Sequence, residues 1–323
     1  MNPMAIRDSR NNRRNLIGFL ILLASMMALA GCSIHPRTSS RAAECSAPVD
    51  RMTLVQNAAD YEALFTLAGG LKPMSSGFWR CSFEVDNPDL TELEKVRDML
   101  EALRNEVWYA DIQIFAKVHD GERNAHAFVV HRQSLAAMID RHEPFWSSWD
   151  ITPETHPTEV VEIVDRLPRA DRWRGYGYLY GYPDEAVDFF VEAGISADDE
   201  DREMGPGKDR QFTQIPTYAA ESGRFTYAVP VDHEPTEADR HLAEQARLIL
   251  DAYIERRPHM IDVDVAIREL LELNSRFEPS PMTDTFWFAA VSSLMISLLE
   301  LQSYPPYLLL KALCVLLEEK ASS

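Results

Sequence analysis

Two strand-like runs joined by Asp120-Gly121 constrain the fold of this chain more than any other feature. Residues 107–118 and 122–131 are rich in β-branched, aromatic and alternating apolar side chains, and Asp-Gly between such runs is a strong signal for a tight hairpin. A two-residue turn at this point pairs residues whose numbers sum to 241. Ile112 then faces Val129, Ile114 faces Ala127, Ala116 faces Ala125, and Phe115 faces His126 on the other side.

The segments around this hairpin predict one more strand and several helices. Residues 78–85 alternate between apolar and polar side chains, which is typical of a half-buried strand. Residues 58–67 form a short helical pattern that ends at Gly69-Gly70. Thr91 and Glu94 have the spacing of a capping box, and four leucines and valines then share one helical face. We therefore expect an α+β fold with a small antiparallel sheet packed by helices.

The carboxyl half is predicted to be mainly helical. Helical patterns cover 134–142, 155–166 and 170–193, and Thr236 caps a further helix that runs to about residue 256. The runs 211–217 and 224–230 flank Ser222-Gly223 and suggest a second hairpin. The apolar runs 286–301 and 307–317 are each too short to cross a bilayer, so a buried helical hairpin is the better interpretation. We expect residues 53–323 to form a single domain, with a mixed part over 53–231 and a helical part over 232–323.

The first residues predict export and membrane attachment. Four arginines precede an apolar run over 16–30, which ends in Leu29-Ala30-Gly31-Cys32. This arrangement resembles bacterial lipoprotein precursors, in which a lipobox ends in an obligatory cysteine. The resemblance implies a signal peptide over 1–31, lipidation of Cys32, and a membrane partner reached through that anchor. Ser33 after the cysteine implies the outer membrane, facing the periplasm, in a Gram-negative host. Residues 32–52 then serve as a flexible tether.

The charge balance excludes one class of partner. The net charge is −19, and it becomes −22 from Cys32 onward because residues 1–31 carry four arginines and one aspartate. A surface this acidic repels phosphate backbones, so we expect no nucleic-acid partner.

Three cysteines remain if Cys32 is lipidated. Cys45, Cys81 and Cys314 allow at most one internal disulfide, in any of three pairings. Cys81 lies among alternating apolar residues and Cys314 lies among leucines, so both resemble small buried hydrophobic residues, although an oxidising compartment allows pairing.

No local motif identifies a catalytic or metal site. His126 and His131 differ by an odd number and point to opposite faces of a strand, which argues against a histidine metal site. We expect no metal and no cofactor. The glycine-bounded loop over 69–79 places Lys72 near Ser75 and Ser76 and is the best candidate for a small polar site, although glycine, proline and serine are also typical of ordinary turns.

Aromatic residues concentrate between 145 and 182. Trp146, Trp149 and Tyr178 are candidate ligand-binding residues because large, rigid side chains with a polar tip suit glycan or peptide ligands, although the same residues also suit a core. In the stretch GYGYLYGYP, Gly181 ends one helix and Pro183 begins the next, so Trp173, Tyr176 and Tyr180 form a stripe and Tyr178 is the tyrosine expected to be exposed.

Three functions remain open from the sequence. The first is a lipid-anchored binding or structural protein of the cell envelope, with an envelope protein or a glycan as ligand. The second is an extracytoplasmic hydrolase whose site is assembled from distant segments. The third is an assembly subunit that uses the apolar carboxyl-terminal hairpin as an interface.

Overall fold

The structure, a computed structural model, describes Cys45 and residues 50–198 and 210–277. All of these residues belong to one compact unit that covers residues 43–323. The predicted apolar hairpin over 286–317 and most of the acidic segment over 197–210 lie outside the described residues, as does Cys32.

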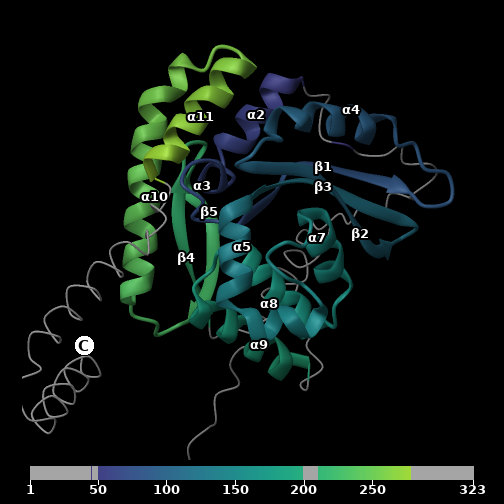
Figure 1. Cartoon of the computed structure of the whole chain (residues 1–323). Helices are drawn as coiled ribbons and strands as arrows, with labels where there is room; N and C mark the ends of the chain where they lie inside the picture. Colours follow the sequence, from purple (N-terminus) through teal and green to yellow (C-terminus); the bar gives the residue numbers. More distant parts are fainter. Residues whose placement is uncertain (1–44, 46–49, 199–209, 278–323) are drawn as a thin grey trace, which may run out of the picture. The chain divides into compact units, whose positions relative to one another are not determined.

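A three-stranded antiparallel sheet forms the centre of the fold and confirms the α+β prediction (Figure 1). Strands β1 (Met74–Glu84), β2 (Trp108–His119) and β3 (Glu122–His131) lie in the order β1-β3-β2. The predicted Asp120-Gly121 turn joins β2 to β3. Both residues have positive φ angles, 52° and 83°, which Asp and Gly tolerate better than most residues.

The register of this hairpin differs from the prediction over most of its length. Close to the turn the pairing is as expected, with Val118 opposite Arg123. A bulge between Ile114 and Val118 then shifts the pairing by two residues, so Ile112 lies opposite Ala127 and not Val129. Because the shift is an even number, the side chains of the paired residues keep their predicted face of the sheet. The prediction of the apolar face is therefore correct, although the predicted cross-strand partners are wrong.

Helices cover both faces of this sheet. On one face, α2 (Arg51–Ala59), α3 (Leu64–Leu67) and α4 (Thr91–Leu100) pack on the alternating side chains Trp79, Cys81 and Phe83 of β1. On the other face, α5 (Arg132–Arg141), α7 (Pro157–Arg166) and α8 (Arg169–Leu179) enclose Phe128 and Val130 of β3. The short helix α6 (Glu143–Trp146) extends this second core. Figure 1 shows α2 and α4 on one side of the sheet and α5, α7 and α8 on the other.

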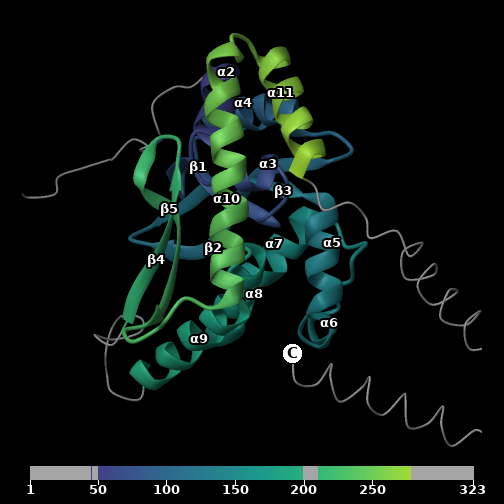
Figure 2. The ribbon, with the colours of Figure 1, turned by 90° about the vertical axis from the view of Figure 1, so that its left-hand side faces the viewer.

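A second hairpin packs beside this assembly, next to helix α9 (Asp184–Asp198). Strands β4 (Arg210–Thr217) and β5 (Ala220–Pro230) pair with each other, as the sequence suggests. The turn, however, lies at residues 218–219, and Ser222-Gly223 falls within β5. Helices α10 (Glu237–Arg256) and α11 (Val263–Phe277) follow and pack together (Figure 2).

The predicted capping box at Thr91 and the predicted helix cap at Thr236 have opposite outcomes. Thr236 and Asp239 form a full capping box at the start of α10. Thr91, in contrast, lies inside the first turn of α4, where its backbone N–H donates to Asp89 at 3.1 Å. Its side chain therefore does not cap the helix.

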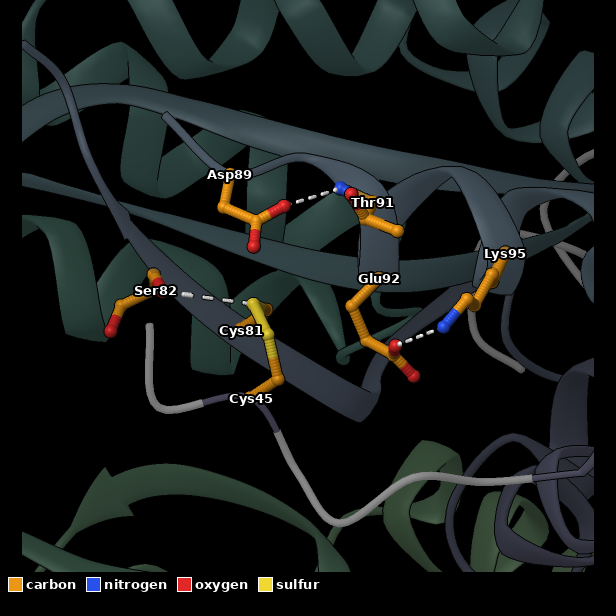
Figure 3. Close-up of a disulfide and its surroundings, with 7 residues drawn as sticks. All are labelled: Cys45, Cys81, Ser82, Asp89, Thr91, Glu92 and Lys95. Carbon is orange, nitrogen blue, oxygen red and sulfur yellow. Dashed lines mark hydrogen bonds and ion pairs between the residues drawn. A yellow bond between two sulfur atoms is a disulfide. The ribbon is translucent and has the colours of Figure 1, made fainter. Parts of the chain in front are cut away.

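A disulfide joins Cys45 to Cys81 on β1 (Figure 3). This pairing corrects the interpretation of Cys81 as a free buried thiol, although its sulfur is buried as expected. It also attaches the chain to the sheet six residues before α2 begins, within the range predicted as tether. In the described part of the chain, no helix has the length and apolar character that crossing a membrane requires.

Candidate ligand-binding site

The GYGYLYGYP stretch forms the predicted corner between two helices. Helix α8 ends at Leu179, Gly181 adopts a φ of +68°, and α9 begins at Asp184. Glycine is required at 181 because an added Cβ would lie 2.7 Å from the backbone oxygen of Leu71. The backbone at this corner therefore lies directly against the loop that carries Lys72.

Tyr178 is buried, which contradicts its predicted exposure and its candidacy as a ligand-binding residue. Its ring stacks on His142 with centroids 3.9 Å apart, and Phe145 and Trp146 lie against it. Arg174 donates a hydrogen bond to its hydroxyl oxygen at 3.2 Å. Helical spacing turns Tyr178 away from Trp173, Tyr176 and Tyr180 and into the second core.

The other three aromatic residues of α8 and its end, Trp173, Tyr176 and Tyr180, line a pocket of about 330 Å³. Five more aromatic side chains from other elements complete its walls: Phe115 of β2, Tyr182 of the corner, Phe190 of α9, Phe212 of β4 and Tyr227 of β5. Phe212 is 53% exposed, so part of this lining reaches the surface. We call this cavity the aromatic pocket. Its volume is typical of small-ligand sites, and rings from six parts of the chain converge on it.

Polar groups hold the tyrosines of this pocket in position. The side-chain amide of Gln113 donates to the Tyr176 oxygen at 2.5 Å, and Tyr227 donates to Asp239 at 2.6 Å. Asp239 also accepts hydrogen bonds from His233 and Thr236. Burial by itself favours the neutral form of Asp239, but these hydrogen bonds prevail and lower its pKa to about 2.

A second, more polar cavity of about 530 Å³ lies next to the aromatic pocket. Asn57, Tyr61 and Glu62 line it from α2 and the turn that follows, and Thr226 lines it from β5. Residues 76–78 and Arg80 of β1 form a further wall. We call this cavity the polar pocket.

Ser76, Tyr180 and Thr226 form the boundary between the two pockets. Thr226 lines both of them. Ser76 of the polar pocket and Tyr180 of the aromatic pocket share a hydrogen bond, with their hydroxyl oxygens 3.0 Å apart. Burial raises the pKa of Tyr180 to about 12, so this hydroxyl stays neutral at physiological pH. The two cavities are thus adjacent parts of one candidate site.

Lys72 lies buried behind this boundary. Its ammonium group bonds to Glu62 at 2.8 Å and lies 4.5, 5.3 and 5.9 Å from the ring centroids of Phe225, Tyr180 and Tyr182. Burial lowers the pKa of Lys72, and the charge of Glu62 acts in the opposite direction. Lys72 therefore supports the rings of the aromatic pocket and the carboxylate of the polar pocket without lining either cavity.

The other predicted site residues have mixed outcomes. Ser76 lines the polar pocket, but Ser75 is fully buried and its hydroxyl pairs with Thr66 at 2.8 Å. Trp146 is buried in the second core, and Trp149 packs against that core. Alternation along β1 explains the difference between the two serines, because neighbouring side chains of a strand point to opposite sides.

His126 lies at the centre of the sheet, opposite Arg80 on β1 and Gln113 on β2. Its ring makes a T-shaped contact with Phe115, with centroids 4.8 Å apart, although Gln113 and not Phe115 is its cross-strand partner, contrary to the predicted register. Burial, with the positive charge of Arg80 as a second cause, lowers the pKa of His126 to about 4. Among the described residues, no three acidic, histidine or cysteine side chains come together as a metal site.

Sequence reasoning missed Phe115, Phe212, Tyr227 and Asn57 as members of this site. The one available signal was the aromatic stripe on α8, which identifies a single wall. Comparison with known protein families, with curated proteins and with solved structures returned no match.

Proposed function

We propose that this protein is a lipid-anchored binding protein of the bacterial cell envelope, and that the aromatic pocket is its ligand site. The observation that carries this proposal is the pocket of about 330 Å³ lined by eight aromatic side chains. Rings from separate elements are a typical means of holding an apolar or ring-shaped group, because each ring buries a large area with little loss of conformational entropy.

The lipobox at Cys32 supports the envelope location. The disulfide between Cys45 and Cys81 is in keeping with it, because disulfides persist mainly in oxidising compartments outside the cytosol. Twelve residues separate Cys32 from Cys45. At about 3.5 Å per residue, a lipidated Cys32 holds the disulfide within roughly 45 Å of the membrane surface.

The surroundings of the candidate serines do not favour the hydrolase alternative. Ser75 is buried against Thr66, and the hydroxyl of Ser76 contacts Tyr180, whose raised pKa makes it a poor general base. The assembly alternative rests on the carboxyl-terminal runs outside the described residues.

The fluorescent dye 1-anilinonaphthalene-8-sulfonate tests the ligand site, because its ring system suits an aromatic pocket. We expect saturable binding of one dye molecule to the folded protein. Phe212→Ala should weaken this binding at least fivefold, whereas Tyr218→Ala, which removes a similarly exposed ring outside the pocket, should not. Equal effects of the two substitutions would reject the aromatic pocket as the site.

The anchor is tested separately by metabolic labelling with palmitate. We expect the wild-type chain to incorporate label and Cys32→Ser to remain an unlabelled precursor. Label that survives in Cys32→Ser would contradict lipidation at this residue.

A further inference from the structure

We infer that the ligand is an extended peptide, with one bulky apolar side chain in the aromatic pocket and its main chain in the polar pocket. This inference rests on the proposed function and assigns a chemical class to its ligand. It follows from three features: the adjacency of the two cavities, their different polarity, and the sheet edges that line the polar one.

The adjacency sets the shape of the ligand. Ser76 and Tyr180 bond to each other across the boundary, and Thr226 lines both cavities. The two cavities therefore share a boundary only a few side chains wide, and a ligand that occupies both must be extended across it. A compact apolar molecule would leave the polar pocket unused.

The different polarity of the two cavities indicates the chemical class of the ligand. The aromatic pocket offers ring faces, whereas the polar pocket offers an amide at Asn57, hydroxyl groups at Tyr61, Ser76 and Thr226, and a carboxylate at Glu62. Peptides combine these requirements, because a bulky side chain branches from a main chain that both donates and accepts hydrogen bonds.

The sheet edges favour a peptide over a glycan. Strand β1 is an edge strand of the three-stranded sheet, and β5, which carries Thr226, belongs to the two-stranded sheet. Both strands line the polar pocket. Sheet edges bind extended peptides through main-chain hydrogen bonds, while pockets nearby select side chains.

A bulge in the pairing of β1 with β3 lies at this place. The register jumps from the pair Ser76–Phe128 to the pair Arg80–His126, so residues 77–79 lie opposite a single residue of β3. Gly77 within this bulge has a φ of +85°, and an added Cβ would lie 2.9 Å from the Arg80 guanidinium. Bulges of this kind occur at sheet edges beside binding sites, where they disrupt the regular ladder.

Binding of blocked pentapeptides tests the inference. The probe is acetyl-Ser-Ala-Phe-Ala-Ser-amide, its control has Ala in place of Phe, and toluene and chitotriose serve as a side-chain mimic and a glycan. We expect the Phe peptide to bind at least tenfold more tightly than the Ala peptide and than toluene. Affinities are measured by calorimetry on residues 33–323, which contain the whole compact unit and lack the predicted signal peptide and lipidation site.

Variants of Asn57 separate the two pockets, because this half-buried residue lines only the polar one. Asn57→Ala should weaken binding of the Phe peptide at least threefold, and the space-filling Asn57→Trp should weaken it at least tenfold. Both variants should leave dye binding unchanged. Melting temperature confirms that each variant is folded.

Three outcomes would overturn the inference. Toluene binding as tightly as the Phe peptide would show that the main chain is not recognised. Chitotriose binding that Asn57→Trp abolishes would identify a glycan ligand. Dye binding at the aromatic pocket without peptide binding would refute a peptide ligand while leaving the proposed function intact. If the dye does not bind either, the proposed function itself is rejected.

Discussion

The hydroxyl groups of Ser76 and Tyr180 lie 3.0 Å apart although the two residues are 104 positions apart in the chain. Ser76 precedes a bulge in an edge strand, and Tyr180 is the C-cap residue of α8 at the α8–α9 corner. Their hydrogen bond joins the first part of the sheet to the helical layer and divides the candidate site into its two cavities.

This hydrogen bond should be measurable by a double-mutant cycle. Tyr180→Phe and Ser76→Ala each remove one hydroxyl, and each should lower the free energy of unfolding by about 1 kcal/mol. The double variant should cost little more than either single one, since both remove the same bond. Urea unfolding of the four proteins gives the coupling energy. Strictly additive effects would argue against the bond.

Removing either partner of the buried Lys72–Glu62 ion pair should affect the free energy of unfolding to a different extent. Glu62→Gln leaves the fully buried Lys72 without its counter-charge, whereas Lys72→Met leaves a carboxylate that is 27% exposed. We expect Glu62→Gln to destabilise the protein by about 3 kcal/mol and Lys72→Met by distinctly less.

Combining both substitutions should recover part of the loss, because neither charge is then left unpaired. Chemical denaturation at pH 7 measures all three variants. If Lys72→Met lowered the free energy of unfolding more than Glu62→Gln does, the greater burial of Lys72 would not decide the cost of breaking this ion pair.

Asp239 predicts a loss of stability in acid. Its pKa is about 2 in the folded protein, below the 3.8 of an exposed aspartate carboxyl group such as that of the unfolded chain, so the folded state binds the proton less readily. The stabilisation is complete above about pH 4 and is lost as the pH falls through about 2. It amounts to roughly 2 kcal/mol.

Asp239→Asn should therefore be less stable than the wild type at pH 7, and the gap should narrow below pH 3. Thermal unfolding at a series of pH values measures both proteins, and Glu237→Gln, at an exposed acidic residue in the first turn of the same helix, is the control. If the difference in stability between the two proteins did not change with pH, the lowered pKa of Asp239 would be refuted.

Because of the disulfide between Cys45 and Cys81, the stability of the protein should depend on whether it is oxidised. Residues 45 and 81 close a loop with a sequence separation of 36, for which loop-closure entropy gives about 3–4 kcal/mol. Cys45→Ser should lower the free energy of unfolding by that order. Dithiothreitol should have the same effect on the wild type and none on the variant, as measured by denaturant unfolding. Equal sensitivity of both proteins to the reductant would contradict this pairing.

The sequence by itself predicted the α+β fold class, the Asp120-Gly121 hairpin, the helix cap at Thr236 and the corner at Gly181. Each of these features depends on a turn, a cap or a periodic pattern within a short stretch of chain. Backbone preferences and alternation act locally, so neighbouring residues suffice to reveal them.

Tertiary structure decided the pairing within the sheet and the composition of the site. A bulge shifted the register of β2 by two residues, and no local pattern marked it. The α8 stripe was visible in the sequence, but Phe115, Phe212 and Tyr227 lie on three other strands and meet it only in the folded chain. A pocket is formed by side chains from distant segments, and their convergence depends on how the layers pack together. The sequence therefore determined the helix corner, whereas packing made its aromatic residues one wall of a cavity.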